Sequence, residues 1–136
     1  LLRLFDERDV AIVIGHELAH NIKGHATKGV LAGVLGALVS LAVDADEIGE
    51  FVAAQFSPTL EAEADYVGLY IVANSGVTIQ GAENIWRKFA AEFAGSKEKT
   101  LMDTHPPTPE RYIAIRNTVL EIDEKKKNGI PLRPNN

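Results

Sequence analysis

The chain has 136 residues, a formal net charge of −5, four histidines and no cysteine. The length suits a single domain with its own core, and the missing cysteines exclude disulfides, thiolate zinc sites, iron–sulfur clusters and cysteine nucleophiles. The acidic balance argues against a nucleic-acid partner, which would require a basic face. If a transition metal binds, imidazole and carboxylate groups must therefore hold it.

The first half of the chain contains two helix patterns. Acidic residues suit the helix dipole at an N-terminus and predict a first helix from Asp6 to about Ala26. Ser57 and Pro58 are typical of an N-cap and a first helical residue, and they predict a helix that ends at about Asn74. No segment alternates between polar and apolar residues as a half-buried strand does.

The second half of the chain contains two more helix patterns. Thr78 is expected to cap a helix that ends at Gly95, and residues 95–107 are expected to form a loop. Thr108 and Pro109 are expected to begin a last helix with three lysines in its final turn. The fold class that these patterns predict is mainly α.

Residues 29–43 form an uncharged run of 15 small and apolar residues. A membrane span needs about 20 such residues, so the length favours a buried or partner-facing helix. A membrane-inserted or membrane-contacting hairpin is the alternative, since small residues allow close helix approach. Because the chain begins with Leu1 and a helical pattern follows almost at once, we interpret residues 1–136 as one domain, cut from a longer protein.

The functional prediction rests on residues 16–20, which read HELAH. Residues four apart on a helix are separated by about 40° around its axis, so His16 and His20 can hold one zinc ion. Glu17 lies about 100° from His16, where it can reach a zinc-bound water. Two ligands and a general base on one turn of helix are typical of a zinc hydrolase. The apolar residues 11–15 argue against the alternative, a solvated helix face.

A catalytic zinc also needs a third protein ligand and an open position. On a continuous helix His25 would lie about 180° from His16, which favours a structural or outer-shell role over ligation. Glu61 and Asp65 lie one turn apart, so Glu61 fits as the third ligand and Asp65 as an acceptor for the free ring N–H of a ligand histidine. An ordinary solvated acidic helix start is the alternative that spacing leaves open.

Three motifs in this order resemble the HtpX-type and CAAX-prenyl-endopeptidase-type zinc metallopeptidases, which are gluzincins. They are HELAH at residues 16–20, EAEAD at residues 61–65, and DTHPP at residues 103–107 followed by Arg111. The resemblance covers residues 9 to about 116. It implies one zinc ion held by His16, His20 and Glu61.

The same resemblance gives roles to four further residues. Glu17 matches the catalytic base, Asp65 matches an outer-shell aspartate, and His105 and Arg111 match an element near the site. His105 could donate to the oxyanion of a tetrahedral intermediate, or it could fill the open position and silence the site. Arg111 could orient the His105 loop by pairing with a carboxylate, or it could be solvated.

The resemblance further implies a zincin-type helical core and a protein or peptide substrate. Members of the family lie in membranes or in the cell envelope, including the periplasm, and often serve protein quality control. A small β-sheet, whose edge strand lies along the peptide substrate, normally precedes the HExxH helix, and this chain is expected to lack it.

Two functions follow as hypotheses. The first is a zinc metalloendopeptidase that hydrolyses peptide bonds through a zinc-activated water, with Glu17 as general base and then general acid. The second is a non-proteolytic, zinc-stabilised module that binds clients or a membrane, which a closed site with four protein ligands would favour.

Overall fold

The computed structural model describes residues 5–25, 58–95 and 105–135. These ranges contain the helices α1 (Glu7–Ile22), α3 (Pro58–Asn74), η1 (Ala82–Asn84), α4 (Ile85–Glu92) and α6 (Pro109–Lys127). No strand occurs in these three ranges, and the predicted mainly α fold class is confirmed. Residues 29–43, predicted as a buried or membrane-contacting segment, lie outside the described residues.

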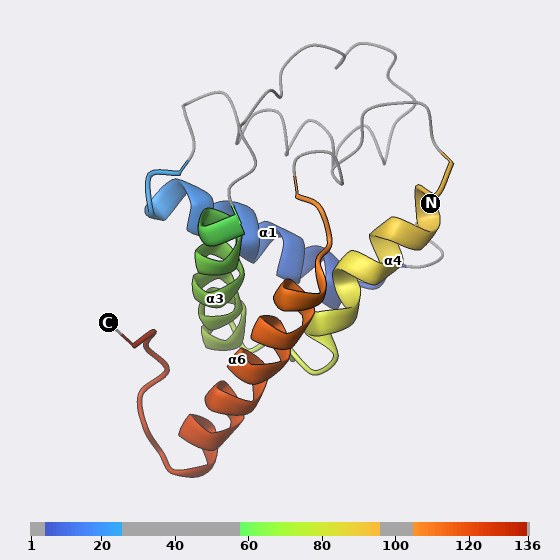
Figure 1. Ribbon diagram of the computed structural model, residues 1–136. Helices are drawn as coiled ribbons and strands as arrows, with labels where there is room; N and C mark the ends of the chain where they lie inside the picture. The colour runs from blue at the N-terminus through green and yellow to red at the C-terminus, as the bar shows by residue number, and fades with distance from the viewer. Residues whose placement is uncertain (1–4, 26–57, 96–104, 136) are drawn as a thin grey trace.

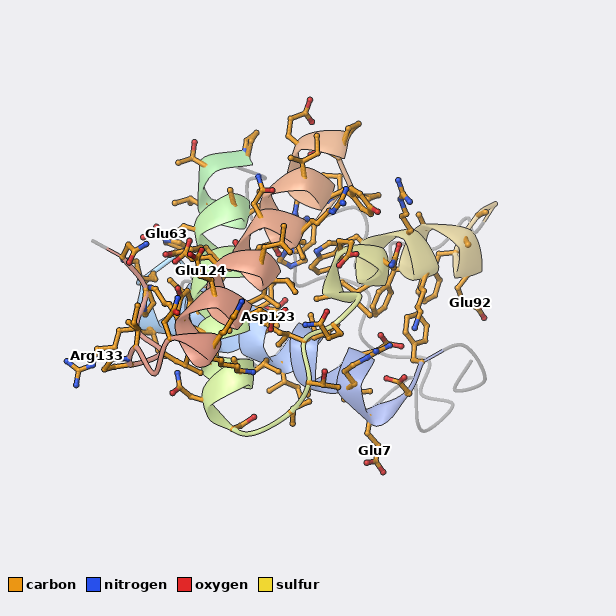
Figure 2. The ribbon with its side chains drawn as sticks, turned by 90° about the horizontal axis from the view of Figure 1, so that it is seen from below. Glu7, Glu63, Glu92, Asp123, Glu124 and Arg133 are labelled. Atoms are coloured by element: carbon orange, nitrogen blue, oxygen red, sulfur yellow. The ribbon has the colours of Figure 1, made fainter. Side chains whose placement is uncertain are left out.

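The helix α3 is central to the arrangement, because it packs against both α1 and α6 (Figure 1). The side chains of Glu7, Glu92 and Arg133 point outward from the helices in Figure 2. Of the largest side chains, the most fully buried are Val13, His16, Tyr70, Ile79, Ile85 and Ile122. No helix among the described residues is long and apolar enough to cross a bilayer.

The start of α1 follows the predicted signal, but its end does not. The Asp6 carboxylate accepts a hydrogen bond from the Asp9 backbone N–H, and the Asp9 carboxylate accepts one from the Asp6 backbone N–H. The predicted continuation to Ala26 is wrong, because α1 ends at Ile22. Gly24 adopts a φ of +72°, a left-handed conformation that stops the helix there.

The other helix boundaries depend on similarly local features. The predicted span of α3 to Asn74 is confirmed. The predicted helix start at Thr78 is wrong, because Gly81 adopts a φ of +80° and regular α-helix begins only at Ile85. The predicted start of α6 is confirmed, since the Thr108 hydroxyl accepts a hydrogen bond from a backbone N–H of the first turn.

The helices α1 and α3 cross with their backbones in direct contact at Gly15 and Gly68. A Cβ atom on Gly15 would lie 2.9 Å from the Gly68 carbonyl oxygen and 2.5 Å from Val72 Cγ2. A Cβ atom on Gly68 would lie 2.8 Å from the His16 backbone nitrogen. Only glycine therefore fits at these two positions.

We expect Gly68→Ala to destabilise the protein. Alanine would be favoured by about 1 kcal/mol of helix propensity, but its methyl group would overlap the rigid backbone of α1. The expected net loss is about 1–3 kcal/mol of unfolding free energy, measured by urea denaturation. The control Asn117→Ala changes an exposed position of α6 and should stay within about 0.5 kcal/mol. A Gly68→Ala protein as stable as the unsubstituted chain would contradict this packing.

Candidate metal centre

Four buried side chains from three parts of the chain converge on one point. His16 and His20 come from α1, Glu61 comes from the first turn of α3, and His105 precedes α6. One ligand atom from each lies within 4.8 Å of the others, so the cluster could hold a metal ion. The predicted ligands His16, His20 and Glu61 thus meet in space.

The donor set suits zinc. The Nε2 atoms of His16 and His20 lie 3.0 Å apart. Glu61 places one carboxylate oxygen 3.3 Å from His16 Nε2 and the other 3.1 Å from His20 Nε2. Imidazole nitrogen and carboxylate oxygen are both common zinc ligands in open, catalytic sites.

The ionisation of this cluster favours a positive charge at its centre. Burial by itself would lower the pKa of His16, but the carboxylates of Asp65 and Glu61 raise that pKa to about 9. Burial would raise the pKa of Glu61, but the histidines around its carboxyl hold that pKa well below the usual range. A proton or a metal ion can supply the positive charge that these carboxylates stabilise.

Asp65 and Arg111 support the cluster from behind. Asp65 lies one turn after Glu61, and its Oδ1 is 2.8 Å from His16 Nδ1. The two atoms lie within hydrogen-bond distance, but His16 Nδ1 is not aligned with the carboxylate oxygen and has no hydrogen-bond partner among the described residues. Arg111 donates from Nε and Nη2 to the two oxygens of Asp65, at 2.7 and 2.8 Å. The bidentate geometry fixes the carboxylate in one orientation.

Arg111 also connects α3 to the segment that carries His105. Its Nη1 donates to the Pro106 carbonyl at 3.1 Å and lies 3.3 Å from Glu61 Oε2. The side chain of Arg111 is only 3% exposed, so the alternative of a solvated arginine is wrong. The pairing with carboxylates, predicted as the other possibility, is what the structure contains.

Glu17 is buried beside the cluster with part of its carboxylate unsatisfied. Its Oε1 accepts no hydrogen bond within the described residues. The same oxygen lies 3.4 Å from Nε2 of His105. Because a buried carboxylate oxygen without a hydrogen bond costs free energy, Glu17 is suited to accept a proton from a group that enters the site.

His105 lies between the carboxylates of Glu61 and Glu17. Its Nδ1 is 2.8 Å from Glu61 Oε2 and 3.2 Å from His16 Nε2. The same imidazole can therefore reach the metal position or remain beside it. Both predicted roles of His105, a fourth ligand and a hydrogen-bond donor, are sterically available.

Trp86 is the site residue that sequence reasoning missed. Its ring stacks on His105 with a centroid distance of 6.1 Å, and it meets the His16 ring edge to face at 5.1 Å. The guanidinium carbon of Arg111 lies 4.2 Å above the indole. The indole thus forms one wall of the cluster and limits the positions of three site residues. A single tryptophan in an amphipathic helix gives no signal that separates this role from ordinary core packing.

Comparison with known proteins agrees with this geometry. The sequence model of the family described as Peptidase family M48 matches residues 1–119 of the chain. The chain belongs to peptidase family M48. The resemblance to zinc metallopeptidases that the three motifs indicated is thereby confirmed.

Curated relatives of this M48 protein are also peptidases by name. It is 29% identical to metalloprotease LoiP of Escherichia coli over 133 residues, which cover 86% of the chain and 52% of LoiP. It is 29% identical to mitochondrial metalloendopeptidase OMA1 of Arabidopsis thaliana over 113 residues, which cover 77% of the chain and 23% of OMA1. Metalloprotease YcaL of Escherichia coli is 24% identical, with 88% of the chain and 52% of YcaL covered. The chain thus spans about half the length of these relatives, or less. No solved structure matches it.

We expect Arg111→Lys to destabilise this M48 protein although the charge is retained. A lysine cannot reproduce the fork that binds both Asp65 oxygens and the Pro106 carbonyl. The expected loss is about 1–3 kcal/mol of unfolding free energy, because buried acceptors would stay unpaired. The control Arg116→Lys makes the same change at an exposed position of α6. Equal stability of the two variants in urea would show that the fork contributes nothing.

Proposed function

We propose that this protein is a zinc metalloendopeptidase. In this proposal His16, His20 and Glu61 hold one zinc ion, and Glu17 is the general base and acid of peptide-bond hydrolysis. The observation that carries it is the buried carboxylate of Glu17, whose Oε1 accepts no hydrogen bond among the described residues, next to a cluster of three imidazoles and a carboxylate. Membership of peptidase family M48 and the names of the relatives support the same function.

The zinc ion would polarise the scissile carbonyl and lower the pKa of its bound water to about 7. Glu17 would take the proton of that water and later deliver it to the leaving amine. Its side chain is 4% exposed, so bulk water does not compete strongly for the proton. A structural zinc site does not require a general base at this position, which favours a catalytic function.

The groups around the cluster would hold the ligands in place during the reaction. Asp65 would fix the orientation of the His16 ring, and Arg111 would fix Asp65 in turn. His105 would donate from its ring to the oxyanion that forms on the scissile carbonyl. Trp86 would limit rotation of the His105 ring by stacking on it.

A non-proteolytic, zinc-stabilised module remains the second candidate. The observation in its favour is the position of His105, which lies close enough to the other three side chains to close the site as a fourth ligand. Complete closure by protein ligands is typical of structural zinc. In that case Glu17 would have no chemical task.

The substrate of the proposed enzyme would be a protein or peptide, as for other peptidases. Action in the cell envelope, at a membrane or in protein quality control is implied by the motif resemblance and stays a prediction. The same holds for membrane contact through residues 29–43.

We expect Glu17→Gln to keep zinc and to lose activity. The carboxamide has nearly the same shape but cannot accept the proton of the bound water. Loss of a general base should lower the rate by about 100- to 10,000-fold. Cleavage of fluorescently labelled, unfolded casein gives the rate, and metal analysis after dialysis gives the zinc content. The control Glu110→Gln changes an exposed carboxylate of α6 and should cleave at the original rate. A Glu17→Gln protein that holds zinc and cleaves casein at full rate would contradict the proposal.

A further inference from the structure

His25 lies next to the metal cluster although it is not part of it. The end of α1 explains its place. Gly24 adopts a φ of +72°, its N–H donates to the Asn21 carbonyl at 3.0 Å, and the His25 N–H donates to the His20 carbonyl at 2.8 Å. This pattern is a Schellman motif, which folds the chain back over the last turn of the helix. His25 therefore returns to the side of His20, and not to the opposite side that a continuous helix predicts.

The His25 ring connects a predicted metal ligand to a second carboxylate of α3. Its Nδ1 lies 3.3 Å from His20 Nδ1, and its Nε2 lies 2.9 Å from Glu63 Oε2. The His25 side chain is 7% exposed, and Glu63 is 36% exposed. Glu63 also pairs with Lys23 at 2.6 Å. A carboxylate offers only acceptor atoms, so the His25 ring nitrogen that faces Glu63 is the donor in this contact.

These contacts allow one arrangement of protons, given the zinc site proposed above. If His20 binds the ion through Nε2, its single proton is on Nδ1 and points toward His25. His25 Nδ1 must then accept, which places the His25 proton on Nε2. That proton points toward Glu63, which can accept it.

We propose that His25 and Glu63 are positioning residues that orient the ring of His20 toward the metal. His16 has its own carboxylate, Asp65, in direct contact. The corresponding carboxylate for His20 would be that of Glu63, with the ring of His25 hydrogen-bonded between the two. Glu63 lies about 200° around α3 from Glu61, so it cannot bind the same ion but can support it from outside. Outer-shell hydrogen bonds of this type fix both the tautomer and the orientation of a ligand histidine.

Zinc affinity tests the proposal without a proteolysis assay. The dissociation constant is measured for the 136-residue chain by competition with a fluorescent zinc chelator. We expect His25→Phe, which keeps a ring of similar size, to bind zinc about 10- to 100-fold more weakly. Glu63→Gln should lose less, because its amide oxygen can still accept from His25. The control Lys23→Gln removes the other partner of Glu63, leaves both rings untouched and should bind zinc like the unsubstituted chain.

The protonation of the rings is the second measurement. Long-range ¹H–¹⁵N NMR correlations of the unsubstituted, zinc-loaded chain should show His20 protonated on Nδ1 and His25 protonated on Nε2. The opposite tautomer of His25 would overturn the proposal, even if His25→Phe failed to fold. Equal zinc affinity of His25→Phe and Lys23→Gln would also overturn it, while the proposed zinc site would stand. An unsubstituted chain that bound no zinc would overturn both.

Discussion

The contact between Gly15 and Gly68 is the constraint on which the site depends. Two helices whose side chains separate them have axes about 8–10 Å apart, and here the absence of two Cβ atoms lets the backbones touch. The residue after Gly15 is His16, so the contact places its imidazole directly against α3. One and two turns before Gly68 on α3 lie Asp65 and Glu61, which meet that ring. The distances within the cluster follow from this crossing.

The carboxylates that are buried at this crossing need partners of opposite charge. Among the residues that the structure describes, three buried carboxylates, those of Glu17, Glu61 and Asp65, share the site with one guanidinium, that of Arg111. Removing charges from water costs several kcal/mol each unless partners compensate. Arg111 compensates Asp65 and part of Glu61, and Trp86 shields the pair from water. The excess of negative charge that remains suits a divalent cation at the centre of the histidines.

Local signals in the sequence account for what could be predicted. The spacing of HELAH and EAEAD follows the period of a helix, so the faces that carry the candidate ligands could be assigned from one sequence. Asp6 and Thr108 mark helix starts through side-chain hydrogen bonds to nearby backbone, which is why these boundaries were predicted well. The left-handed conformations of Gly24 and Gly81 were not predicted, because nothing in the neighbouring residues distinguishes them from glycines that a helix tolerates. The positions of Trp86 and His25 depend on contacts between elements distant in the chain or on the geometry of a helix end, and no local pattern specifies these.

Identifying the protein ligands of the metal ion is the measurement that tests the account most directly. Crystals of the zinc-loaded chain, with the ion located by anomalous scattering at the zinc edge, would give it. The account predicts three protein ligands, His16, His20 and Glu61, and a water molecule within reach of Glu17. A fourth protein ligand from His105 in place of that water, or an ion bound elsewhere, would contradict it.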